Sequence, residues 1–376
     1  MENEIVDLLS QLVGINSINP TLSNGPGEET ITKFVAGFLG DLDLDPEIQT
    51  VQPGRTNVVA IIPGNGFAKP LLLNAHLDTV GVEGMDNPFS LKQDGNKLYG
   101  RGAYDMKGSD TIMLLLAKHF SQNTPPMDLH FTFVADEEDK SIGMEYIVEN
   151  WLPKLPKLPA AGIFLEPTEL DIGICHKGFS WFEVEVFGKA AHGSRPEQGI
   201  DAILPLSAAL DELRAIESEL SKKEKHLLLG NPGLHAGLIE GGGELSVLPH
   251  QARLVWERRT LPGETEQSVV AELDRVLNAV KNYPGDHTVN GNPLFSRPPH
   301  ATPRTSAIVQ KLQQFSPNSE IIGCSFWADS ALGGAAGFPS VLFGPVGHGA
   351  HAIDEWVSLQ SLAELYKILK QMIETY

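Results

Sequence analysis

Apolar residues in the first sixty positions follow two different spacings. Residues 5–13 and 31–39 place apolar side chains at i, i+3, i+4, i+7 and i+8, which predicts two amphipathic helices. Proline and glycine within residues 19–27 separate them. Short β-like runs follow at 47–51 and 57–62, so the chain opens with two helices and two strands.

From position 71 onward, predicted strands and helices alternate. Apolar runs at 71–75, 129–135 and 162–165 are typical of buried strands, and helical patterns follow Asp105 and begin again at Gly143. Alternation of this kind predicts an α/β fold whose sheet is mostly parallel and is sandwiched by helices.

The pattern changes after Lys177. Residues 179–187 alternate as a half-exposed strand does, and a helix with Ile203, Leu206 and Leu210 follows. Further segments are predicted at 233–239 and 246–256, as strands, and at 265–280, as a helix. Two helices on one face of a small antiparallel sheet form a two-layer α+β unit of roughly a hundred residues.

The α/β pattern returns after about Asn290, with a helix at 306–315, a strand at 340–343 and a closing amphipathic helix. The α+β unit therefore interrupts the first domain. We predict residues 1–177 and 290–376 as the two parts of an α/β domain, and residues 178–289 as an inserted domain. A length of 376 residues with 41% apolar content agrees with more than one core.

Acidic residues outnumber basic ones by 48 to 28, which gives a formal net charge of −20. No basic run is present, so nucleic acid and anionic membranes are excluded as expected partners. A small acidic substrate stays compatible with this charge, because salt screens distant charges beyond about 8 Å.

Two cysteines, Cys175 and Cys324, lie far apart and outside any Cys-x-x-Cys pattern. This indicates a reduced intracellular setting, although sequence distance leaves a bridge between them open. The first residues, MENEIVDLL, lack the features of a signal peptide, and no run approaches the roughly 18 apolar residues of a membrane span. We expect a soluble cytoplasmic protein.

Several predicted strands end in a histidine or a carboxylate. His76 and Asp78 follow the run at 71–75 and share one side of an extended segment. The runs at 129–135 and 162–165 end in the acidic stretch 136–139 and in Glu166, and the Gly-rich segment 344–349 leads to His351. Ligands of open α/β sheets gather at such strand ends, so we expect a site there.

Each of these residues also has a structural interpretation. His76 could lie in a solvated loop, and Asp136 or Glu138 could cap the helix that follows. Taken together, acids at one sheet edge would repel one another, and a metal ion relieves that conflict. Two histidines and three carboxylates without a thiolate fit a catalytic zinc site, and the acids suffice for two ions about 3.5–4 Å apart. Mn²⁺ or Co²⁺ also accept these ligands.

At this point the chain resembles the dinuclear zinc hydrolases that include acetylornithine deacetylase, succinyl-diaminopimelate desuccinylase, aminoacylase and carboxypeptidase G. The resemblance covers nearly the whole chain. It is carried, in order, by NAHLDTV, GRGAYDMKG, ADEED, LEPT, KAAHGSRPEQG, ERRTLPGE and FGPVGHGAHAIDEWV. It implies a catalytic domain with an inserted lid domain, and a homodimer formed through that lid.

The resemblance also implies a role for each matching residue. One zinc would be held by His76, Asp105 and Glu166, and the other by Glu138, His351 and the bridging Asp105. Three further residues would act in catalysis: Asp78 by orienting His76, Glu137 as general acid/base, and the lid histidine His192, often lent by a partner subunit. Arg259 would bind the substrate carboxylate.

Some positions depart from the family pattern. His235 stands in GLHAG where many relatives carry asparagine, so its expected contact with substrate differs, and Glu257 replaces the commoner aspartate. His348 lies three residues before His351, and a swap between them as metal ligand stays open. Without the resemblance, His192 and Arg259 would be read as surface residues.

The resemblance implies a metal-dependent amidohydrolase that removes an N-acyl group, such as acetyl, from an amino acid. Water held between two divalent ions has a pKa near 7, and Glu137 would take its proton and pass it to the leaving amine. The alternative is a dipeptidase or carboxypeptidase with the same chemistry. A non-catalytic binding protein is disfavoured, because Glu137 and all five expected ligands are present.

Overall fold

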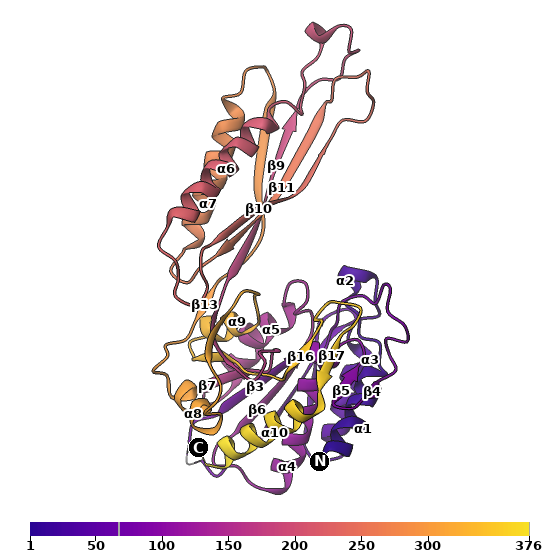
Figure 1. Cartoon of the computed structure of the whole chain (residues 1–376), viewed down its shortest axis with the longest axis vertical. Helices are drawn as coiled ribbons and strands as arrows, with labels where there is room; N and C mark the ends of the chain where they lie inside the picture. Colours follow the sequence, from indigo (N-terminus) through magenta and orange to yellow (C-terminus); the bar gives the residue numbers. More distant parts are fainter. Residues whose placement is uncertain (67, 376) are drawn as a thin grey trace. The chain divides into compact units, whose positions relative to one another are not determined.

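A computed structural model describes residues 1–66 and 68–375 of the chain (Figure 1). The chain forms two compact units. Unit 1 comprises Met1–Ile174, Ala301–Ile322 and Ala328–Tyr376, and unit 2 comprises Cys175–His300 and Gly323–Trp327. Each unit has its own sheet and its own helices.

The main sheet has a parallel centre and antiparallel margins. Its strand order is β1-β2-β6-β3-β7-β15-β8-β13, with β14 pairing β8. The strands are β1 (Glu47–Gln52), β2 (Arg55–Ile62), β3 (Leu71–His76), β6 (Leu129–Val134), β7 (Ala161–Phe164), β8 (Ile172–His176), β13 (His300–Ala301), β14 (Ile321–Cys324) and β15 (Ser340–Leu342). β3 runs parallel to both β6 and β7, and β7 runs parallel to β15. The carboxyl ends of these four strands therefore lie at one edge.

Helices cover this sheet because their apolar faces need burial. They are α1 (Glu2–Val13), α3 (Glu29–Gly40), α4 (Gly108–Gln122), α5 (Ile142–Tyr146), α8 (Ala307–Phe315), α9 (Ser330–Ala335) and α10 (Leu359–Glu374). The short helix α2 (Pro20–Ser23) belongs to the same unit but buries none of its residues. Every residue of β3 and β6 is buried, as expected for strands covered on both faces. A small second sheet, β16-β17-β5-β4, joins Gly347–His348, Trp356–Ser358, Lys97–Tyr99 and Lys92–Asp94. The predicted α/β fold is confirmed.

Unit 2 is a two-layer α+β arrangement. Its antiparallel sheet has the order β10-β11-β9-β12. The elements are β9 (Gly178–Phe187), α6 (Leu206–Lys222), β10 (Gly233–Gly241), β11 (Gln251–Thr260), α7 (Glu266–Lys281) and β12 (Thr288–Arg297). Both helices pack on one face of the sheet, where Phe182, Val184 and Trp256 form part of a buried core.

Two sequence predictions in this region need correction, and one strand was not predicted. The strand predicted at 246–256 is β11, which begins only at Gln251 and runs to Thr260, because Pro249 lacks the N–H that a ladder needs. Ile203 lies before α6 and is 41% exposed, since that helix starts after Pro205. β12 was not predicted, because its glycine, proline and two asparagines have low strand propensity and only pairing with β9 makes it a strand.

Cys175 and Cys324 are both buried, and no disulfide bond joins them. Within the described residues, no helix combines the length and the apolar character that crossing a bilayer requires.

His130, on β6, makes the stability of the protein depend on pH. Its side chain is buried, and burial lowers its pKa to about 4, with only the charge of Asp128 opposing this. The unfolded chain therefore binds this proton near pH 6.5 and the folded chain near pH 4. The stability contributed by the neutral ring is present above pH 6.5 and is lost as the pH falls towards 4.

We expect this loss to reach about 3 kcal/mol, from a shift of roughly 2.5 pKa units. Urea denaturation at pH 7.5, 5.5 and 4.5 should show a shallower acid dependence for His130→Asn than for the wild type. Parallel pH profiles for the two proteins would contradict the assignment.

Candidate metal centre and active site

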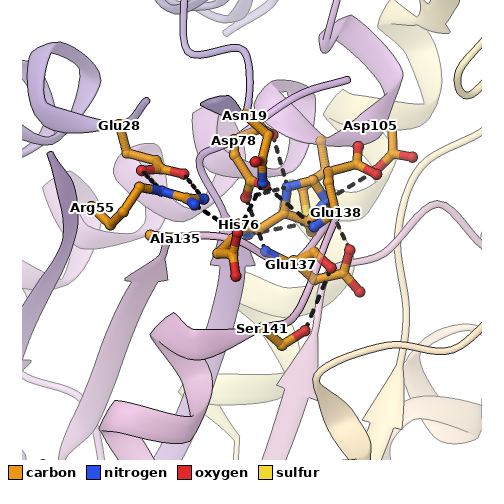
Figure 2. A network of polar contacts seen from close by, with 12 residues as sticks. Asn19, Glu28, Arg55, His76, Asp78, Asp105, Ala135, Glu137, Glu138 and Ser141 are labelled. Atoms are coloured by element: carbon orange, nitrogen blue, oxygen red, sulfur yellow. Dashed lines mark hydrogen bonds and ion pairs between the residues drawn. The ribbon is translucent and has the colours of Figure 1, made fainter. Parts of the chain in front are cut away.

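The expected ligands gather where the parallel strands of unit 1 end. His76 is the last residue of β3, and the loops after β6 and β7 carry Glu137, Glu138 and Glu166. Asp105 lies in the turn before α4. Figure 2 shows His76, Asp105, Glu137 and Glu138 converging from these separate segments.

The distances divide the cluster into two overlapping groups. Ligand atoms of His76, Glu137 and Glu166 lie within 4.8 Å of one another, and so do those of His76, Asp105 and Glu138. The His76 Nε2 atom is 3.1 Å from Asp105 Oδ1 and 4.0 Å from Glu137 Oε2. Either group has the spacing of donors around a metal ion.

His351 joins this cluster, and His348 does not. His351 Nε2 lies 2.8 Å from Glu138 Oε2 and 3.5 Å from Asp105 Oδ2. The side chain of His348 is 64% exposed and is 3.8 Å from Asp354. His351 has a positive φ of 64°, a left-handed conformation that non-glycine residues rarely adopt.

The electrostatics of the cluster fit a cation. Burial raises the pKa of Glu166 to about 8 and that of Glu138 to about 7, and in both the charge of Asp105 adds to the effect. Burial and the charge of Glu166 also raise the pKa of Glu137. Glu138 Oε1 is buried and has no hydrogen-bond partner among the described residues. Crowded carboxylates with an unsatisfied oxygen are what a divalent cation would stabilise, so the residues fit a metal.

Asp78 organises the loop that carries the two glutamates. Its carboxylate accepts hydrogen bonds from the backbone N–H of Glu137 at 3.1 Å and of Glu138 at 3.3 Å. His76 Nδ1 is 3.0 Å from the Asp78 backbone oxygen and 3.7 Å from its carboxylate. Asp78 thus contacts both His76 and the acidic loop, and its backbone oxygen is the nearer partner of the imidazole.

A buried polar network, which the sequence did not predict, supports this loop. Asn19 Nδ2 donates to Asp78 at 2.8 Å and to Asp136 at 3.0 Å. Figure 2 shows Arg55 beside Glu28, 2.6 Å away. Arg55 also lies 2.7 Å from Asp136, and all three side chains are buried. The network holds Asp136, whose positive φ of 69° starts the turn into Glu137.

Glu355 is a second unpredicted support. Its carboxylate accepts hydrogen bonds from Arg101 at 2.6 Å and from the backbone N–H of Gly102, Tyr104 and Asp105 at 2.9–3.1 Å. It is 1% exposed. A buried acid with four donors fixes the turn that presents Asp105.

Two more acids and a tyrosine border the cluster. Asp329 is fully buried, and its charge raises the pKa of Glu137 and of Glu166. The Tyr104 hydroxyl donates to Glu169, which also accepts from the Gly347 N–H at 3.3 Å. This carboxylate therefore joins the segments that precede Asp105 and His351. Most of the residues that hold the ligand-bearing segments have a single signal in the sequence, which is a polar residue inside or beside a run of apolar residues.

Tyr104→Phe is expected to lower the unfolding free energy of the metal-free protein by about 1 kcal/mol. The variant loses the hydrogen bond from Tyr104 to Glu169, and a hydrogen bond to a solvent-exposed acceptor contributes about this much. Urea denaturation of metal-free protein checks this. Tyr99→Phe, whose hydroxyl makes no such bond among the described residues, serves as the control, and an equal effect of both changes would contradict the assignment.

The remaining predicted site residues belong to unit 2. His192 is exposed, and its Nδ1 lies 2.8 Å from Ser194 Oγ. Arg259, on β11, donates from Nε to Glu257 at 2.6 Å and is 35% exposed. His235, on β10, is 64% exposed and lies 3.8 Å from the same glutamate. Their predicted roles in binding and catalysis remain predictions.

Comparison with known proteins places the chain in a family. Residues 72–375 match the model of peptidase family M20/M25/M40. The chain is 27% identical over 381 residues to an acetylornithine deacetylase of Erwinia tasmaniensis, covering 99% of this chain and 97% of the relative.

Solved structures share the fold. A tripeptidase from Staphylococcus aureus has a TM-score of 0.80 at 20% identity, with 100% of this chain and 98% of the other covered. A dinuclear metal-binding peptidase of family M20 from Bacillus subtilis has a TM-score of 0.73 at 16% identity, with the same coverage. The resemblance drawn from the motifs is confirmed. The chain belongs to peptidase family M20/M25/M40 and is a hydrolase of that family.

Proposed function

We propose that this protein hydrolyses the amide bond of an N-acyl amino acid, in the manner of an acetylornithine deacetylase, with the help of two divalent cations. The observation that supports this most is the convergence of His76, Asp105, Glu138 and His351 around buried carboxylates of raised pKa. The similarity to acetylornithine deacetylases over almost the full chain agrees with it.

The proposed ligand sets follow the family resemblance and differ from the two contact groups, one of which has Glu137 where we propose Asp105 and the other His76 where we propose His351. His76, Asp105 and Glu166 would hold one ion, and Asp105, Glu138 and His351 the other. Zinc is the metal that we propose, since imidazole and carboxylate are common zinc ligands, and cobalt or manganese would bind to the same atoms. When bound, such ions polarise a water molecule and the substrate carbonyl.

Glu137 is proposed to move the proton. It lies beside His76 without being needed as a ligand in the proposed sets, and its side chain is 11% exposed. As water attacks the carbonyl carbon, Glu137 accepts its proton. The same proton passes to the nitrogen as the carbon–nitrogen bond breaks, so a carboxylic acid and a free amine leave.

Residues of unit 2 are proposed to bind the substrate. Arg259 would bind its carboxylate, His192 would stabilise the oxygen that gains negative charge, and His235 would contact substrate. We also propose that the inserted domain serves as a lid and joins two copies of the chain. The alternative function is that of a dipeptidase or carboxypeptidase, in which an amino acid replaces the acyl group.

A substrate panel tests the proposal. Protein stripped with a chelator and reloaded with zinc or cobalt would be assayed with N-acetyl and N-succinyl amino acids and with dipeptides, and the released amine would be measured. We expect hydrolysis of N-acyl amino acids that depends on the added metal. Turnover of dipeptides alone would establish the alternative, and turnover that survives complete metal removal would overturn the mechanism.

A further inference from the structure

One face of the unit 2 sheet is left uncovered by helices and carries aromatic side chains. On β9, Phe182 and Val184 point into the core under α6 and α7. Side chains alternate along a strand, so Phe179 and Trp181 point to the opposite face. Phe295 of β12 packs on both, with ring centroids 5.9 Å and 5.8 Å away. We call Phe179, Trp181 and Phe295 the aromatic floor.

The strand register places this floor in two adjacent cross-strand rows. The first row reads Gly233, Arg259, Phe179 and Arg297, and the second reads His235, Glu257, Trp181 and Phe295. Neighbours within and between such rows are in side-chain contact range. Arg259 therefore lies beside the floor, with an apolar ring on one side and glycine on the other.

The surroundings of Arg259 favour the binding of an anion by its guanidinium. Its Nε donates to Glu257 at 2.6 Å, and its guanidinium lies 5.4 Å from the centre of the Phe179 ring. In the described part of the chain, its two terminal nitrogens have no hydrogen-bond partner. Gly233 adds no side chain over the arginine stem; a Cβ there would lie 3.5 Å from Arg259 Cβ. A planar guanidinium whose terminal nitrogens have no partner favours the binding of a carboxylate.

The carboxylates of Glu257, Glu183 and Glu185 on this face already accept hydrogen bonds. Glu257 accepts from Arg259 and from Trp181 Nε1, the latter at 2.9 Å. Glu183 accepts from Arg253, and Glu185 accepts from Gln251. The charge of Arg259 also contributes to lowering the pKa of Lys177, so this ammonium adds positive charge nearby. A substrate ammonium would meet cations here rather than a free carboxylate.

We infer that this face binds the amino acid part of the substrate, and that the preferred side chain is aromatic or large and apolar, as in phenylalanine, rather than cationic, as in ornithine. The carboxylate would bind the terminal nitrogens of Arg259, and the side chain would pack on Trp181 and Phe295. The inference rests on the proposed function and narrows its substrate class.

The test compares kcat/KM for N-acetyl-phenylalanine, N-acetyl-ornithine and N-acetylglycine, together with the matching glycyl dipeptides. We expect phenylalanine to be preferred over ornithine at least about tenfold in whichever series is cleaved. Phe295→Ala should reduce that preference several-fold, and Phe295→Leu should retain most of it. Phe326→Ala, which removes an exposed aromatic ring outside both rows, is the control.

Failure of the inference and failure of the proposed function give different results. Hydrolysis with ornithine equal to or better than phenylalanine overturns the inference alone. Without turnover in either series, the proposed function fails, and calorimetry with free phenylalanine and free ornithine decides the inference by itself. Tighter binding of phenylalanine that weakens in Phe295→Ala supports it, and equal binding of both amino acids refutes it.

Discussion

Glu137→Gln is expected to lower kcat by about 10²–10⁴-fold while the protein keeps its fold and its bound cations. The amide keeps the size of the side chain but cannot accept the proton of the attacking water. Glutamine also removes one of the crowded carboxylates, since the charge of Glu166 helps to raise the pKa of Glu137. The metal-free variant should therefore be at least as stable as the wild type.

Steady-state kinetics, metal analysis and urea denaturation measure these three properties on the same preparations. Glu149→Gln, at an exposed position after α5, is the matched control and should leave all of them unchanged. A Glu137→Gln protein with wild-type kcat would remove Glu137 from the reaction, and one that no longer bound metal would make it a ligand.

Arg55→Met is expected to lower the unfolding free energy by about 3–5 kcal/mol, because it leaves two buried acids without their cation. Glu28 and Asp136 are 0% and 2% exposed, and each lies within 2.7 Å of the guanidinium. Burial raises the pKa of Glu28 to about 7 even beside Arg55. In the variant, Glu28 has lost this cation and would therefore take up a proton. The defect should therefore be smaller at pH 5.5 than at pH 8.

Urea denaturation at both pH values checks the size and the sign of this effect. The double variant Glu28→Gln/Arg55→Met should recover part of the loss, since it removes one of the uncompensated charges. Arg214→Met breaks an ion pair whose two side chains are both 72% exposed and should change stability by less than about 1 kcal/mol. Equal losses for Arg55→Met and Arg214→Met would show that burial does not set the cost.

The sequence by itself determined the elements and the chemistry at their ends. β3 and β6 are short apolar runs followed by histidine or acids. Both features are local in the sequence, so they can be recognised without knowledge of the fold. The motifs around Asp105, Glu166 and His351 identified the family before any contact was known. β12 was missed because its strand character comes from its pairing with β9 in the sheet.

Only the tertiary structure decided how the ligands are held. Asn19 reaches Asp78 across 59 positions, and Arg101 reaches Glu355 across 254. Hydrogen bonds and ion pairs of this kind depend on burial and on distances of about 3 Å, which no local pattern encodes. The same holds for the two rows beside Arg259, since a strand register exists only once the strands have paired.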